Sequence, residues 1–172
     1  MDVLEAIRSR RSARAFLDKD VSNEDVATLI DSARWAPSAG NIQPWELIIV
    51  KKEHVKRQLV DAAQQSFIIE APVVIVVCAN ESRSSQGYGV RGKTLYCIQD
   101  TAAAIQNIHL TAFSLGLGTC WVGAFREEDV ARVLKLPRGI RPVAIIPVGY
   151  PAESPRPRRR RPVNQIIHYE TF

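Results

Sequence analysis

The sequence predicts an α+β fold in which helices flank a mixed, mainly antiparallel sheet. Helix-like and strand-like segments follow one another without the regular alternation that marks a doubly wound parallel sheet. The segment 94–115 is rich in alanine and apolar on all sides, which predicts a long, mostly buried central helix. A chain of 172 residues, 46% of them hydrophobic, can bury one sizeable core but not two. We therefore expect a single domain over residues 1–172, with residues 150–172 as a basic carboxyl-terminal arm.

The amino-terminal half predicts three helices and two strands. A short opening helix carries an apolar face of Val3, Leu4 and Ile7. Ser22, with Asp25 three positions later, predicts the start of a second helix. That helix is expected to end at Trp35 and Pro37. Its apolar face is expected to consist of Val26, Leu29, Ile30 and Ala33. Strands are expected at 45–50 and 72–78, with a helix at 53–66 between them.

The carboxyl-terminal half predicts a loop before the central helix and further strands after it. Residues 80–93 are polar and contain Gly87, Gly89 and Gly92, so we expect a loop there, and the sequence leaves open whether it forms a lid. Gly116 is placed to end the central helix. The remaining elements are expected to be a strand at 119–122, a helix at 127–134 and a strand at 143–148.

An arginine-rich stretch follows the opening helix. It contains Arg10, Arg11 and Arg14 together with Ser12. Guanidinium groups are planar and permanently charged, which suits them to phosphate, and a serine hydroxyl adds a further donor. The same residues also fit a solvated basic face on a surface helix. The stretch by itself therefore leaves a phosphate site and a solvated face equally open.

A polar turn, Pro37-Ser38-Ala39-Gly40-Asn41, precedes the first predicted strand. Proline presets one backbone angle, glycine turns freely, and short polar side chains bond nearby backbone. Such a turn can present amides and a carboxamide to a ligand. With the arginine stretch, it favours a site for a phosphorylated, planar ligand.

Both stretches resemble the nitroreductase family of flavin enzymes, which bind FMN at a homodimer interface. The family's Arg-x-Ser-x-Arg/Lys-x-Phe element matches residues 10–16, and its Pro-Ser-x-x-Asn-x-Gln-Pro-Trp element matches residues 37–45. These two elements, the central helix with the strand after it, and the carboxyl-terminal segments make four motifs in order, a stronger case than any one of them, because short motifs recur by chance. Further similarity to the family lies in the segments 99–107, 115–125, 149–153, 158–162 and 165–167.

The resemblance implies a set of cofactor-binding residues. Arg10 and Ser12 would contact the FMN phosphate or ribityl chain, joined by Arg158 and Arg160 from the arm, with Arg11 also in the cofactor site. Arg14 matches a basic residue near the N1/O2 edge of the isoalloxazine, where positive charge would raise the reduction potential. The resemblance also places in the cofactor site four residues from the second subunit, Pro37, Ser38, Ala39 and Asn41. It places Gln65 at the pyrimidine edge of the flavin, Trp121 in the site, and the backbone amides of Val122 and Gly123 near flavin N5.

The activity implied is ping-pong hydride transfer from NADH or NADPH, through flavin N5, to a small electron-poor acceptor such as a nitroaromatic or a quinone. No side chain is expected to act as a catalytic acid or nucleophile. The sequence lacks a Gly-x-Gly-x-x-Gly fingerprint, so the preference between NADH and NADPH is not readable from it. Alternatives within the resemblance are a flavin-binding sensor or storage protein with little turnover, and a member specialised in flavin fragmentation or dehalogenation.

Composition limits the other classes of protein. A net charge of +5 and the arginines of 156–161 also fit nucleic-acid binding. However, apolar residues after the run, from Val163 to Phe172, favour packing of the arm against the fold, so nucleic acid is not the expected partner. We expect a cytoplasmic protein without a membrane span. Neither metal nor disulfide sites are expected from Cys78, Cys97, Cys120, His54, His109 and His168, which we interpret as core or surface residues.

Overall fold

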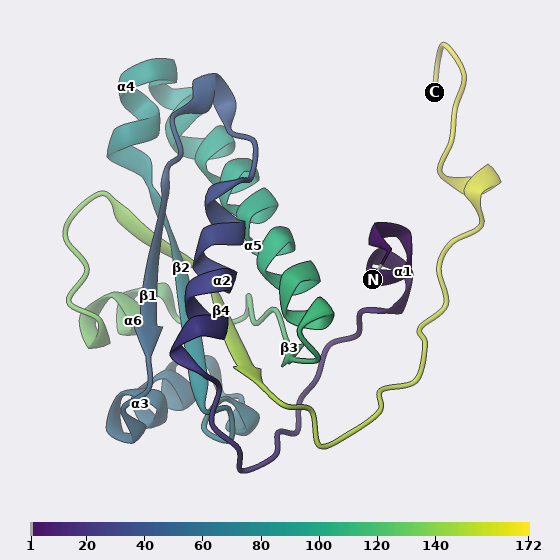
Figure 1. The fold of residues 1–172 in the computed structure, drawn as a ribbon. Coiled ribbons are helices and arrows are strands. Elements are labelled where there is room, and N and C mark those ends of the chain that lie inside the picture. Colours follow the sequence, from purple (N-terminus) through teal and green to yellow (C-terminus); the bar gives the residue numbers. More distant parts are fainter. Residues whose placement is uncertain (1) are drawn as a thin grey trace.

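The computed structural model describes residues 2–172 and shows three layers (Figure 1). The middle layer is a sheet with the strand order β1-β2-β4-β3. All its neighbouring strands pair antiparallel, and the isolated bridge between Ser12 and Thr119 is parallel. The strands are β1 (Trp45–Val50), β2 (Val73–Asn80), β3 (Gly118–Thr119) and β4 (Ile140–Gly149). The predicted α+β class with a mainly antiparallel sheet is confirmed.

Two pairs of helices bury the two faces of the sheet. Helices α2 (Asn23–Arg34) and α5 (Cys97–Ser114) pack on one face, and α3 (Glu53–Ala63) and α6 (Glu127–Val133) pack on the other. Alternate residues of β2 therefore belong to different cores: Val73, Ile75 and Val77 lie under α2 and α5, whereas Val74 and Val76 lie under α3. A strand covered on both faces needs apolar side chains at every position, which explains the unbroken valine-rich run.

Helix ends follow the local sequence chemistry. The Ser22 hydroxyl accepts a 2.9 Å hydrogen bond from the Asp25 amide, as predicted for an N-cap. Ile30 does not join the buried face of α2, because it lies exposed at its edge. Helix α3 ends at Ala63 rather than at residue 66, because Gln64 adopts a left-handed conformation with φ 53°. A short 3₁₀ turn, Ser66–Ile68, follows it.

The loop predicted at 80–93 is wrong, because most of it forms helix α4 (Glu81–Arg91). The Asn80 side chain caps this helix by accepting from the Arg83 amide at 2.9 Å. The glycines of this segment favour a loop over a helix in the sequence. In the structure, Gly92 instead allows the chain after α4 to pack closely on α4, because a side chain at Gly92 would meet the Ser84 carbonyl well inside van der Waals contact. Tyr88 and Gly89 kink the helix.

The central helix is confirmed, with a later start than predicted. A π-helical turn, Gly92–Tyr96, leads into α5, which begins at Cys97. The predicted strand at 119–122 is shorter in the structure, where β3 covers two residues and Val122 makes a separate bridge to Ile145. Strand β4 is longer than predicted at both ends. Cys78, Cys97 and Cys120 are buried and unpaired, as expected.

Helix α1 (Val3–Ser9) and the carboxyl-terminal arm stand to one side of the layered body (Figure 1). The apolar residues Val3, Leu4 and Ile7 of α1 are exposed. All residues of 156–172 are exposed as well, including Tyr169 and Phe172. The start of the arm is bonded to the fold through Pro151 and Ala152, but packing of its apolar residues after Arg161 against the same chain is a wrong prediction. Closely spaced prolines hold the start of the arm extended and lead it away from the sheet.

Candidate functional site

The arginine stretch is an extended segment that is attached to the sheet. Ala13 donates a 3.0 Å backbone hydrogen bond to the Thr119 carbonyl, next to the parallel bridge of Ser12 with Thr119. Gly118 allows this approach, because a side chain there would clash with the Ala13 methyl group. The segment from Arg10 to Arg14, called the arginine loop below, therefore has a fixed position beside β3.

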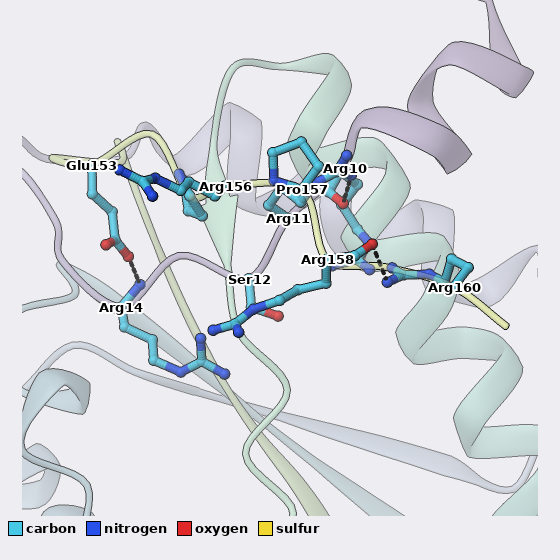
Figure 2. Close-up of a pocket in the computed structure, with 10 residues that line it drawn as sticks. Arg10, Arg11, Ser12, Arg14, Glu153, Arg156, Pro157, Arg158 and Arg160 are labelled. Atoms are coloured by element: carbon cyan, nitrogen blue, oxygen red, sulfur yellow. Dashed lines mark hydrogen bonds between the residues drawn. The ribbon is translucent and has the colours of Figure 1, made fainter.

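The arginine loop and the arm enclose a cavity of about 810 Å³ (Figure 2). Figure 2 shows the Arg158 side chain extending from the arm toward Ser12 and Arg14. Glu153 is the one acidic lining residue, and it accepts a 2.7 Å hydrogen bond from the Arg14 amide. The structure thus brings together six of the residues predicted to bind the cofactor: Arg10, Arg11, Ser12, Arg14, Arg158 and Arg160.

The cavity carries uncompensated positive charge. Burial lowers the pKa of Arg10, and the neighbouring charges of Arg11 and Arg160 lower it further. The Nε atoms of Arg10 and Arg11 are buried and have no hydrogen-bond partner within residues 2–172. Arg11 also uses its Nη1 to donate to the carbonyls of Arg8 (2.6 Å) and Arg10 (2.9 Å) at the end of α1. Buried donors without acceptors are costly, so the cavity is suited to an anion that can accept from them.

A second, shallower hollow of about 150 Å³ adjoins the first through Arg14, which lines both. Its lining includes five predicted site residues: Arg14, Gln65, Trp121, Val122 and Gly123. The Val122 amide donates to the Ile145 carbonyl at 3.0 Å, so the predicted role of this amide near flavin N5 conflicts with the sheet. The Gly123 amide makes no hydrogen bond to the described part of the chain and remains a possible donor to a ligand.

The polar turn lies apart from both hollows within one chain. Ala39 donates its amide to Asp100 Oδ1 at 3.1 Å, and Asp100 lies in the first turn of α5. The arginine loop contacts β3, which follows the other end of that helix. An α-helix rises about 1.5 Å per residue, so the length of α5 separates them by about 20 Å. The structure therefore does not bring Pro37, Ser38, Ala39 and Asn41 to the cavity of the same chain.

The turn itself is tightly constrained. Asn41 and Gln43 have positive φ angles of 56° and 54°, a conformation that asparagine adopts readily and that costs about 1–2 kcal/mol for a residue such as glutamine. Ser38 Oγ accepts from the Gln43 amide at 3.0 Å, so this hydroxyl oxygen has a role within the turn. Strained backbone held by several contacts is typical of functional segments.

Several lining or supporting residues had no signal in the sequence. The buried residue His109 occurs singly, without motif spacing that would mark it, and the segments that contain Asp100 and Thr119 were noted for resemblance without a role for either side chain. Phe67, Cys120 and Ala124 resemble ordinary core residues. Glu153 and Arg156 lie inside segments noted for resemblance or charge, so their position next to the arginine loop could have been suspected.

Comparison with known proteins identifies the family. The model of the nitroreductase family matches residues 7–69 and 61–150. The chain belongs to the nitroreductase family. An FMN reductase (NADPH) of Bacillus subtilis is 30% identical over 185 residues, covering 99% of this chain and 74% of that protein. A protein of Methanothermobacter thermautotrophicus, whose name carries both NADH dehydrogenase and NAD(P)H nitroreductase, is 37% identical over 163 residues, covering 92% and 82%.

Solved structures share the fold of this nitroreductase family member. B. megaterium NfrA2 superposes with a TM-score of 0.93 at 29% identity, covering all of this chain and 76% of the other. B. megaterium NfrA1 gives a TM-score of 0.89 at 33% identity, covering 99% and 74%. Within residues 2–172 of this nitroreductase family member, no helix meets the length and apolarity needed to cross a membrane.

Proposed function

We propose that this chain is an FMN-dependent NAD(P)H oxidoreductase that reduces small electron-poor acceptors. The observation that carries the proposal is the cationic cavity, with the unpartnered Nε atoms of Arg10 and Arg11, which shares Arg14 with a hollow lined by Trp121 and Gly123. An anion site next to a partly apolar site matches a ligand that has a phosphate at one end and an aromatic ring system at the other.

The residues present fit the FMN phosphate. Arg10 and Arg11 supply buried donors that lack acceptors, and Arg158 and Arg160 add charge from the arm. Ser12 adds a hydroxyl between them. These groups would bind a phosphate dianion by charge-assisted hydrogen bonds and hold it at a fixed place beside β3.

The residues of the smaller hollow would orient the ring. Bound FMN would supply the redox chemistry, which is hydride transfer between NADH or NADPH and an acceptor by way of N5 in a ping-pong cycle. Arg14 would place positive charge near the N1/O2 edge, Gln65 would face the pyrimidine edge, and the Gly123 amide would donate toward N5. We propose no acid, base or nucleophile among the side chains.

We also propose that the working form is a homodimer. Within one chain the polar turn is separated from the cavity, so Ser38 and Asn41 reach a flavin only if a second copy supplies them. The apolar residues of α1 and of the arm, such as Ile7 and Phe172, are exposed in the single chain. A second copy that covers them would bury this surface and complete the site in one step.

The experiment is an anaerobic absorption spectrum of the purified chain before and after NADH or NADPH is added. We expect a bound-flavin spectrum that bleaches, followed by recovery of the colour when a quinone or nitroaromatic is added. A spectrum that persists with either nicotinamide would instead support the sensor or storage alternative. Absence of binding with excess FMN would overturn the proposal.

A matched pair of variants tests the phosphate anchor. Arg10→Ala removes a partly buried guanidinium, and the loss of a charge-assisted hydrogen bond is expected to weaken FMN binding by about 10- to 100-fold. Arg138→Ala removes an exposed guanidinium elsewhere and should leave the affinity unchanged. Equal affinities of the two variants in a fluorescence titration would remove Arg10 from the anchor.

A further inference from the structure

His109 lies beneath the candidate site, on the inner side of α5. Only 3% of the residue is exposed. Its Nδ1 atom is 2.7 Å from Thr119 Oγ1, a hydrogen bond between two buried side chains. Its ring also lies beside the Trp121 indole, with 6.0 Å between ring centroids and a tilt of 31°. One side chain of the central helix thus contacts a residue under the arginine loop and an aromatic residue of the smaller hollow.

Thr119 is the residue through which the arginine loop is attached to the sheet. Its carbonyl accepts from the Ala13 amide at 3.0 Å, and it forms the bridge with Ser12. Its own side chain is buried and bonds to His109. The position of the loop therefore depends on a chain of contacts from α5 through His109 and Thr119 to Ala13.

The imidazole is neutral at physiological pH. Burial lowers the pKa of His109 to about 4, and the nearby positive charge of Arg10 contributes to the lowering. The neighbouring Cys120 thiol is also neutral, because burial raises its pKa. A neutral, hydrogen-bonded ring can support the loop from behind without placing another positive charge next to Arg10.

We propose that His109 is a positioning residue for the phosphate anchor: its hydrogen bond to Thr119 holds the arginine loop in the geometry that binds phosphate. This inference rests on the proposed flavin function. It assigns His109 no contact with the cofactor and no chemical step. Loss of the hydrogen bond loosens the loop, and the loss of affinity is confined to ligands that carry a phosphate.

The test compares FMN with riboflavin, which has the same ring system but no phosphate. His109→Phe keeps an aromatic ring beside Trp121 and removes the atom that bonds Thr119. We expect its FMN dissociation constant to rise about tenfold, with riboflavin affinity nearly unchanged. His109→Asn keeps a polar atom near the Nδ1 position, so it should restore most of the preference for FMN. His54→Phe changes an exposed histidine and serves as the control.

Changes at Thr119 test the same hydrogen bond from its other end. Thr119→Val removes the hydroxyl at constant shape and should lower FMN affinity as His109→Phe does, whereas Thr119→Ser should retain it. The double variant His109→Phe/Thr119→Val should lose little more than either single variant, because both remove one interaction. This pair keeps the test decisive if His109→Phe does not fold.

The outcomes separate the two proposals. Equal weakening of FMN and riboflavin, or no weakening of FMN, overturns the role of His109 while leaving the flavin function in place. Failure of the unmodified chain to bind either flavin overturns the flavin function, and this inference with it.

Discussion

Asp100 is a buried carboxylate with one of its two oxygens bonded. Oδ1 accepts from the Ala39 amide, and Oδ2 is buried without a partner in the described chain. Burial raises the pKa of Asp100, and the hydrogen bond from Ala39 opposes that shift. A role for the Asp100 carboxylate in holding the strained turn in place, through its bond to Ala39, explains why a carboxylate is buried here.

Replacement of Asp100 is expected to loosen this turn. Asp100→Leu leaves the partly buried Ala39 amide without its acceptor and should lower the free energy of unfolding by about 1–3 kcal/mol. Asp100→Asn keeps an acceptor at Oδ1 and should cost less. Urea unfolding measures both, with Asp18→Asn on the surface as the control. Equal costs for Leu and Asn would show that the bond to Ala39 contributes nothing.

The part of the candidate site that one chain brings together was predicted where its residues formed the arginine motif, whereas the residues of the polar turn, also a motif, lie away from the cavity of the same chain. Arg10, Ser12 and Arg14 were expected together and line one cavity. His109 and Asp100 were not, because a single buried polar residue has no spacing by which the sequence can reveal its partner. Their roles depend on contacts with Thr119 and Ala39, which only the folded chain brings close.

At the scale of elements, the sequence predicted buried strands and helices well and α4 poorly. The β2 strand is an almost unbroken apolar run, and α5 is a long segment rich in alanine and isoleucine, so both leave little choice of structure. The α4 segment is polar and glycine-rich, so its helical form depends on packing and on the Asn80 cap. The helix propensities of single residues carry no information on such tertiary contacts, which is why the sequence predicted a loop where α4 forms.

The contact between α4 and the following π-helical turn gives a prediction for Gly92. Its φ and ψ are helical, so alanine alone would gain up to about 1 kcal/mol of helix propensity. The added methyl group would press on the Ser84 backbone carbonyl, however, and such overpacking costs about 1–3 kcal/mol. Gly92→Ala should therefore lower the melting temperature by a few degrees. Ser85→Ala on α4 is the control. A melting temperature of Gly92→Ala above that of the parent chain would refute this packing argument.

For the whole molecule, the pKa of His109 links stability to pH. The folded value is about 4 against an ordinary value of 6.5. Between these pH values the unfolded chain binds a proton that the folded chain does not, so the free energy of unfolding falls as pH falls through this window. A shift of this size is worth about 3 kcal/mol in total.

The chain should therefore lose stability between neutral pH and pH 4 more steeply than His109→Asn, which has no imidazole to protonate. Urea unfolding at a series of pH values measures both slopes, and subtraction removes the titration of the carboxylates they share. Parallel curves would contradict the assignment of the linkage to His109.

The arm marks the limit of sequence analysis at this scale. Its apolar residues predicted packing against the fold of the same chain, but Ile166 and Phe172 are exposed in the single chain. A sequence carries no statement of which copy of the chain a segment packs against. The layered body was predictable because its two hydrophobic cores form within the chain.

The three buried cysteines affect how the protein can be handled in the laboratory. Burial raises the pKa of Cys78 to about 12 and raises the pKa values of Cys97 and Cys120 as well, so their thiolates are scarce and shielded at neutral pH. A cysteine introduced at an exposed position of the arm would thus be the thiol that reacts with a maleimide. A dye or spin label can be attached there without first replacing the native cysteines.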